Sequence, residues 1–208
     1  MTHTPSKKKQ ACHICERSYE RSFLYRENQY FCSYKCWFGY LKNLHQAAGP
    51  AITEKNTFTT QEVYPVSIEN VSPIEAKDLL DSGNGYVYID VRSMSEYEMG
   101  HPSGAYNIPI LHRQGGGMIP NLDFVQVVEK NFSHETKLLL GCQMGARSMQ
   151  AAEALAAAGF NSLSNVAGGY GGVRDTSGNL IQAGWAESGL PTEKGKTEGT
   201  DYTSISEK

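Results

Sequence analysis

A cysteine that follows an apolar run and precedes an alanine-rich run is the residue best suited to chemistry. Cys142 comes directly after KLLLG, typical of a buried strand, and opens CQMGARS, which leads into MQAAEALAAAGF. In open α/β sheets, ligands bind in loops at the carboxyl ends of the strands. The N–H groups of such a loop and of the first helical turn lack helical partners, and the helix dipole adds positive potential. Both features favour a thiolate and any anion that it meets.

Two other residues of this loop fit the same chemistry. Arg147 adds a permanent cation whose planar fork suits an oxyanion, and Gly145 allows a turn tight enough to aim amides inward. A lone cysteine is most often a buried core residue, and an arginine at a helix start is often a solvated charge. The strand, loop and helix around Cys142 favour the functional interpretation.

Four further cysteines form a separate set near the N-terminus, with the spacing C-x2-C-x16-C-x3-C: Cys12, Cys15, Cys32 and Cys36. Two close pairs are what a tetrahedral four-thiolate zinc site needs. A module of about 35 residues cannot bury enough surface to fold alone, so this zinc would be structural. Two disulfides, a redox pair in the first two cysteines, or His13 in place of one ligand are the less favoured alternatives.

The segments around Cys142 alternate between strand and helix patterns. Helices are predicted in VSPIEAKDLL, where Ser72 and Glu75 form a capping box, and in SMSEYEMG, PNLDFVQVVEKNF and RSMQAAEALAAAGF. Strands are predicted in YVYIDV, AYNIPI, KLLLG and NSLSNVAGG. Such alternation predicts an α/β fold, with a doubly wound, mostly parallel sheet covered by helices on both faces.

Composition shifts divide the chain into five parts. We expect a disordered lead, a four-cysteine zinc module, a linker, an α/β domain and a disordered tail, at residues 1–10, 11–45, 46–65, 66–192 and 193–208. The polar start and the lack of a long apolar run predict a cytoplasmic protein without a membrane partner. Residues 1–45 hold eight Lys or Arg against three Glu, an excess too small to indicate nucleic acid.

Several motifs together carry a resemblance to a known family. CQMGARS resembles the active-site loop of the rhodanese family of sulfurtransferases, and its surroundings agree in order and spacing: YIDVRSMSEY, GHPSGAYNIP, AGGYGG and WAESGLP. GMIPNLDF is similar to single-domain rhodaneses typified by plant senescence-associated and plastid sulfurtransferases. Pro102 and Ser103 depart from the usual pattern, which we expect to alter a turn. The N-terminal cysteines are similar to treble-clef, TRASH- or MYM-type zinc modules.

The resemblance implies a ping-pong sulfurtransferase. The Cys142 thiolate would take sulfur from a donor such as thiosulfate or a persulfide, hold it as a persulfide and pass it to a thiol or protein acceptor. The residues implied to bind the sulfur and its donor follow directly: Gln143, Met144, Gly145, Ala146, Arg147 and Ser148. Arg147 would bind the donor's anionic end, while Asp90 and Arg92 resemble a structural pair. Zinc would be the sole cofactor, and its module would dock a partner.

Two other functions stay open. A binding or redox-sensing protein would use Cys142 without turnover, although no second cysteine lies nearby in sequence. A phosphatase or arsenate reductase of related fold would need C-x5-R, whereas Cys142 to Arg147 gives C-x4-R. His101, His112 and Tyr170 are interpreted as structural, and RQGGGM at 113–118 as a flexible loop.

Overall fold

A five-stranded parallel sheet forms the centre of the second of the two units into which the chain divides, Met1–Val63 and Tyr64–Lys208. The computed structural model describes residues 10–11, 18–19, 24–26, 29–31 and 66–207. The strand order in the sheet is β5 (Glu69–Val71), β12 (Leu163–Val166), β11 (Lys137–Gly141), β6 (Tyr86–Asp90) and β8 (Tyr106–Asn107). Every neighbouring pair is parallel, which confirms the predicted sheet.

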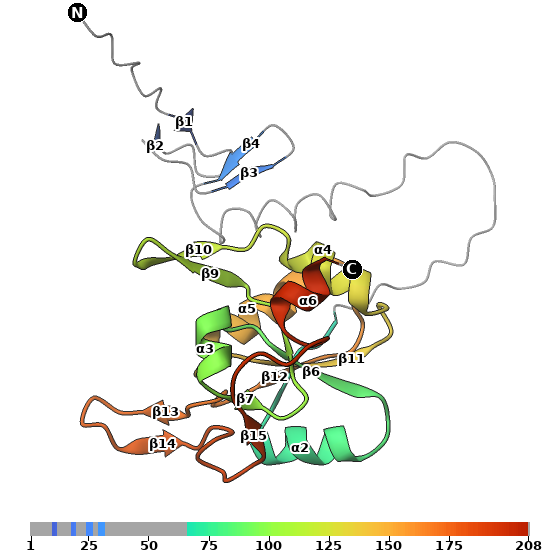
Figure 1. Cartoon of the computed structure of the whole chain (residues 1–208), viewed down its shortest axis with the longest axis vertical. Coiled ribbons are helices and arrows are strands. Elements are labelled where there is room, and N and C mark those ends of the chain that lie inside the picture. Colours follow the sequence, from blue (N-terminus) through green and yellow to red (C-terminus); the bar gives the residue numbers. More distant parts are fainter. Residues whose placement is uncertain (1–9, 12–17, 20–23, 27–28, 32–65, 208) are drawn as a thin grey trace, which may run out of the picture. The chain divides into compact units, whose positions relative to one another are not determined.

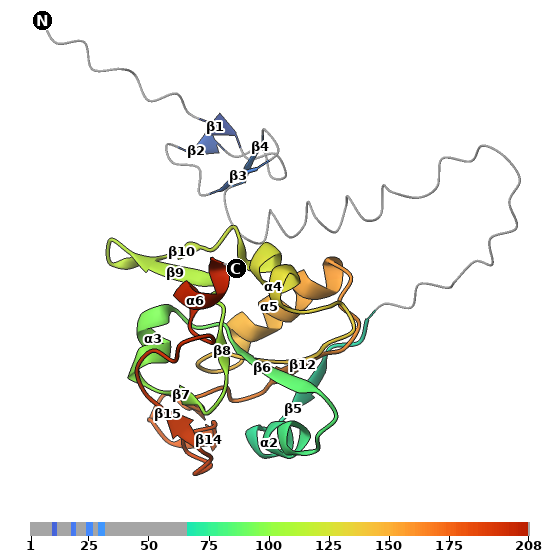
Figure 2. The ribbon, with the colours of Figure 1, turned by 45° about the vertical axis from the view of Figure 1, so that its right-hand side comes forward.

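Helices cover both faces of this sheet, as predicted. Figures 1 and 2 show α2 (Pro73–Asp81) on one face, with α4 (Phe124–Asn131) and α5 (Ala146–Ala157) on the other. Helix α2 begins with the expected capping box, in which Glu75 N–H donates to Ser72 Oγ and the Glu75 carboxylate accepts from Ser72 N–H. A second capping box starts α3 (Met94–Met99), which Gly100 ends.

The core between α2 and the sheet includes Trp185, which lies in the segment after the last strand of the sheet. Tyr88, Leu139 and Val166 come from adjacent strands and pack with Ala76 and Trp185 in one buried cluster. The Trp185 ring meets the Tyr88 ring edge-on at 5.3 Å, and its indole N–H donates to Pro191 O at 2.8 Å. Trp185 therefore anchors the WAESGLP motif in the core, while Ala186 and Glu187 are exposed.

Two hairpins extend from the domain. The first joins β9 (Leu111–Gln114) to β10 (Gly117–Pro120), and the second joins β13 (Val173–Arg174) to β14 (Leu180–Gln182). In Figure 1 both reach toward the side of the domain that carries α3. The segment 113–118 was expected to be a flexible loop and is instead a hairpin. The two central glycines, with φ of 58° and 80°, supply the left-handed backbone that such a tight turn requires.

The first unit contributes two short antiparallel pairs. Strand β1 (Gln10–Ala11) pairs with β2 (Ser18–Tyr19), and β3 (Leu24–Arg26) pairs with β4 (Gln29–Phe31). Cys12, Cys15, Cys32 and Cys36 lie outside the described residues. The zinc module therefore stays a prediction. Within the described residues, no group of His, Cys, Asp or Glu is arranged to hold a metal ion, and no helix is long and apolar enough to cross a bilayer.

The expectation of a disordered tail was wrong for residues 193–207. Strand β15 (Thr192–Glu193) pairs antiparallel with β7 (His101–Pro102), and α6 (Tyr202–Ser206) packs on α4. Ile205 is fully buried, and Asn131 Nδ2 donates to its carbonyl oxygen at 3.1 Å. One apolar anchor gives no periodic pattern, so the contacts that order this segment are invisible in its own sequence.

Ile205→Ala should therefore destabilise the domain. Removing a fully buried isoleucine side chain costs about 2–4 kcal/mol through lost burial and the cavity left behind. Urea denaturation of the full chain measures this change. Thr203→Ala, an exposed position of the same helix, is the control and should change the free energy of unfolding by less than about 0.5 kcal/mol. Equal effects of the two substitutions would show that the tail is not part of the cooperative core.

Candidate active site

The cysteine loop, residues 142–147, joins β11 to α5 at the carboxyl end of the sheet, where the sequence predicted it. Cys142 is 2% exposed. Its sulfur accepts hydrogen bonds from Gly145 N–H at 3.1 Å and from the Ser148 hydroxyl at 3.4 Å. Ser148 is fully buried and its hydroxyl also lies 3.0 Å from Gly145 O, so one proton serves two acceptors. Two hydrogen bonds therefore hold the Cys142 sulfur at the start of α5.

Backbone amides dominate the rest of the loop. Gly145 caps α5 with φ of 106°, a left-handed conformation that other residues adopt at a cost. Among the described residues, the N–H groups of Gln143, Met144, Ala146 and Arg147 have no hydrogen-bond acceptor. Unpaired amides at a helix start are a site for an anion. Met144 is 56% exposed, so the loop reaches the surface at that position.

The glycine loop, residues 168–172, fixes the orientation of these amides. Tyr170 N–H donates to Cys142 O at 2.8 Å, and Gly171 N–H donates to Gln143 O at 3.0 Å. Because the N–H and C=O of one peptide point in opposite directions, the amides of Gln143 and Met144 are turned away from the glycine loop. A side chain at Gly169 would overlap Cys142 O, so this approach needs glycine. Tyr170 is thus structural, as interpreted from the sequence, and its backbone N–H also holds the cysteine loop in place.

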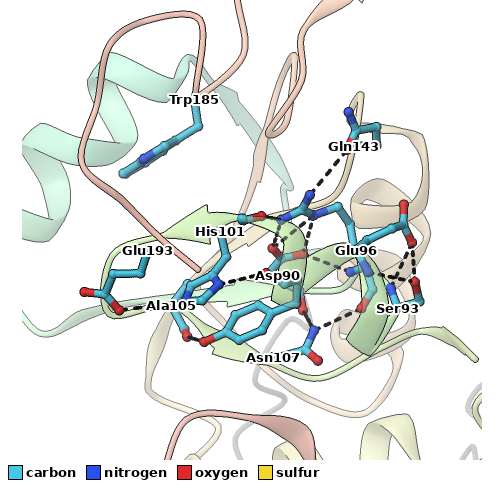
Figure 3. Close-up of polar contacts among 12 residues, drawn as sticks. Asp90, Ser93, Glu96, His101, Ala105, Asn107, Gln143, Trp185 and Glu193 are labelled. Carbon is cyan, nitrogen blue, oxygen red and sulfur yellow. Dashed lines mark hydrogen bonds and ion pairs between the residues drawn. The ribbon is translucent and has the colours of Figure 1, made fainter. Parts of the chain in front are cut away.

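Arg92 links the cysteine loop to the end of β6. Its guanidinium donates to Asp90 through Nε at 3.0 Å and through Nη2 at 2.6 Å, and Nη2 also donates to Gly100 O at 2.7 Å. Figure 3 shows its further contact with Gln143, a 3.4 Å hydrogen bond from Nη1 to Oε1. The guanidinium carbon also lies 4.2 Å from the centre of the Tyr170 ring. Asp90 and Arg92 are thus a buried pair, as expected, that also supports the loop.

Asp90 affects the pKa of two buried neighbours, Arg92 and Tyr88. Burial lowers the pKa of Arg92, but the charge and hydrogen bonds of Asp90 outweigh burial and raise it overall. Burial, then the Asp90 charge, raises the pKa of Tyr88 well above its usual value, so this phenol stays neutral. The Tyr88 hydroxyl lies against Gly141, the residue before the cysteine loop, and a side chain at Gly141 would overlap it. Nothing in YVYIDV distinguished Tyr88 from an ordinary strand residue.

Arg147, for which donor binding stays a prediction, is paired with Glu96 in the structure. Nη1 donates to Glu96 Oε2 at 2.9 Å, and Nη2 donates to Oε1 at 2.7 Å. The same carboxylate accepts from Ser93 N–H at 3.0 Å and from the Ser93 hydroxyl at 2.6 Å, as Figure 3 shows. Burial raises the pKa of Glu96, but the hydrogen bonds from Arg147 and Ser93 outweigh it and lower the pKa to about 2. Glu96 was not among the predicted site residues.

Fold and site together define a class of α/β protein with a buried cysteine at a strand-to-helix loop. A family model described as "Rhodanese-like domain" matches residues 72–176, which include this loop. The chain belongs to the rhodanese-like family.

Relatives and a solved structure agree with this assignment. The chain is 37% identical over 124 residues to "Thiosulfate sulfurtransferase 16, chloroplastic" of Arabidopsis thaliana, covering 60% of this chain and 92% of that protein. It is 36% identical over 110 residues to "Senescence-associated protein DIN1" of Raphanus sativus, where 53% of this chain covers 54% of the relative. The crystal structure of Rv0390 from M. tuberculosis superposes with a TM-score of 0.54 at 26% identity, covering 62% and 100% of the two chains.

Removing the Arg92 charge should strongly destabilise the fold. Arg92→Leu leaves Asp90 buried without its partner, and breaking a buried ion pair in this way costs about 3–5 kcal/mol. Arg174→Leu removes an exposed arginine paired with Glu187 and should cost less than about 1 kcal/mol. Chemical denaturation of both variants measures the contrast. A smaller loss in Arg92→Leu than in Arg174→Leu would refute a structural role for the buried pair.

The lowered pKa of Glu96 predicts a stability that depends on pH. A carboxyl whose pKa falls from 4.5 to about 2 stabilises the folded state above pH 4.5, and this contribution is lost as pH falls toward 2. Its upper bound is about 3 kcal/mol. The difference in unfolding free energy between the wild type and Glu96→Gln should therefore be largest at pH 6 and shrink as the pH is lowered to 3.

The exposed Glu75 provides the control for this pH series. It occupies an equivalent capping box in α2 without an arginine partner. Glu75→Gln should show a much smaller dependence on pH, because solvent screens its carboxylate. A Glu96→Gln difference that stays constant from pH 6 to 3 would contradict the lowered pKa.

Proposed function

We propose that the chain is a sulfurtransferase that carries sulfur on Cys142. The Cys142 thiolate attacks the outer sulfur of the donor, the donor's S–S bond breaks, and its electron pair leaves with the inner sulfur, as sulfite from thiosulfate or as a thiolate from a persulfide. An acceptor thiolate then attacks the terminal sulfur of the enzyme persulfide and regenerates Cys142. The observation that carries this proposal is a cysteine sulfur that accepts two hydrogen bonds beside unpaired amides.

The loop amides would hold the transferred sulfur. The terminal sulfur of a persulfide carries negative charge, and preorganised N–H donors stabilise such charge without rearranging. The unpaired amides of Gln143, Met144, Ala146 and Arg147 are available for this purpose, since the loop's first two carbonyl groups are bound by the glycine loop. Ser148 and Gly145 would hold the inner sulfur through the hydrogen bonds that they already make.

The relatives and the sequence support sulfur transfer over the two alternatives, a redox sensor and a phosphatase. The name of the Arabidopsis protein calls that protein a thiosulfate sulfurtransferase. A redox sensor needs a thiol to resolve the oxidised cysteine, and Cys142 is the free cysteine of the described residues. The spacing C-x4-R leaves the loop one residue short of the phosphatase pattern.

The remaining expectations stay predictions. The described residues do not test three of them: a structural zinc on the N-terminal cysteines, a partner that docks there, and a thiol or protein acceptor. A cytoplasmic location is likewise a prediction. The name of the Arabidopsis relative calls that protein chloroplastic.

Intact mass under non-reducing conditions tests the proposed function. After incubation with thiosulfate or a small persulfide, the wild type should gain the mass of one sulfur atom, which cyanide should remove as thiocyanate. Cys142→Ser should gain nothing, because it lacks the nucleophile. Ser148→Ala should still form the persulfide, about 3–10 times more slowly, since it loses one hydrogen bond to the sulfur. Normal sulfur transfer by a folded Cys142→Ser variant would refute the proposal.

A further inference from the structure

The two arginines that reach the cysteine loop are both paired with carboxylates. Arg92 is paired with Asp90 and lies 3.4 Å from Gln143 Oε1, while Arg147, in the loop itself, is held through two nitrogens by Glu96. Each pair sums to zero charge. The positive potential near Cys142 therefore comes from the amides and from the helix start, neither of which carries a net charge.

We propose that Glu96 determines donor preference by occupying the Arg147 fork, so that the site favours a persulfide donor, R–S–SH, over the thiosulfate dianion. This inference rests on the proposed function. Thiosulfate brings two negative charges to a thiolate and needs a cation to offset the repulsion. A persulfide brings at most one negative charge, which lies on the sulfur that the loop amides receive, so it depends less on a cation. Thiosulfate would then act only at high concentration.

The reaction with such a donor is balanced without a further reactant. The Cys142 thiolate attacks the outer sulfur of R–S–SH and forms a new S–S bond. The bond between the two donor sulfurs breaks, and its electron pair leaves with R–S⁻. The departing thiolate takes the proton from the transferred sulfur and leaves as R–SH. The terminal sulfur of the enzyme persulfide then carries the negative charge, where the loop amides are.

Glu96 is held in this arrangement by more than Arg147. Its carboxylate also accepts two hydrogen bonds from Ser93 at the start of α3, so turning away to release the arginine would break one half of the capping box. The side chains of Glu96 and Arg147 are 16% and 20% exposed, which shields the pair from water and salt. A pKa of about 2 keeps Glu96 charged at neutral pH. The donor therefore competes with a fixed carboxylate for Arg147.

Glu96→Gln separates the charge from the cap. A capping box accepts glutamine as well as glutamate at this position. If the glutamine oxygen accepts from Ser93, as Glu96 Oε2 does, its NH₂ group faces Arg147 Nη2, donor against donor. The variant thus keeps α3 capped and removes the carboxylate charge from Arg147, whose Nη2 loses its acceptor while Nη1 can still donate to the retained oxygen. Glu75→Gln is the matched control, because it makes the same change in the capping box of α2, without an arginine.

The experiment follows formation of the Cys142 persulfide by intact mass in single-turnover reactions of the full chain. One donor is sodium thiosulfate, and the other is the persulfide of 2-mercaptoethanol, whose organic part is uncharged. In Glu96→Gln, the half-saturating thiosulfate concentration should fall about tenfold, as expected for one new charge-assisted hydrogen bond. The value for the organic persulfide should stay within about twofold. High salt should reduce the thiosulfate gain, since it screens the attraction between the incoming dianion and the protein.

Three outcomes distinguish this inference from the proposed function. Equal slowing of both donors in Glu96→Gln would show that the ion pair only supports the fold, and would overturn the inference while sulfur transfer stands. A thiosulfate gain that persists in Glu96→Gln/Arg147→Gln would also overturn it, because the arginine would not be its source. A wild type that gains sulfur from neither donor would overturn the proposed function itself.

Discussion

The buried guanidinium of Arg92 is the interaction on which the site depends. It connects the end of β6, the carbonyl group that ends α3, the side chain of Gln143 and the ring of Tyr170. A cation that is 2% exposed is tolerated because Asp90 neutralises it and its N–H groups find acceptors. The planar guanidinium carries several N–H donors, so one arginine side chain can donate to acceptors in several directions, whereas lysine cannot. Because a buried charge without partners is costly, Arg92 holds together the segments, far apart in sequence, that supply its acceptors.

The cysteine loop is supported from outside, which leaves the N–H groups on its inner side unpaired. The glycine loop binds its first two carbonyl groups, and the amides of the same peptides turn the other way. The glycine loop is itself anchored, since Trp185 N–H donates to Gly169 O at 2.8 Å. The tail adds a further tie, because β15 pairs with β7 directly after Gly100. Preorganised donors of this kind stabilise charge without moving during the reaction.

What could be predicted from the sequence was local. The capping box at Ser72, the alanine-rich helix and the position of Cys142 between strand and helix are encoded within a few residues, and the structure has them. Ser93 and Glu96 form a second capping box, so a local signal marked the Glu96 carboxylate. Its partner Arg147 lies 51 residues further along, and no local pattern joins them. The tail likewise depends on partners elsewhere in the chain, which explains why it was expected to be disordered.

The pairing of Arg147 separates two ways of stabilising negative sulfur. A free guanidinium presents a planar fork that matches a flat or trigonal oxyanion, so it selects the donor by the group that leaves. Amide N–H groups at a helix start converge on one atom and are indifferent to what that atom was attached to. Because both arginines are paired with carboxylates, the cysteine loop relies on its amide N–H groups to stabilise negative charge on sulfur. In the proposed function, such a site would stabilise the enzyme persulfide itself, the species shared by every donor and acceptor. The loop would then hold sulfur, and Glu96 would limit how strongly it selects the molecule that delivers it.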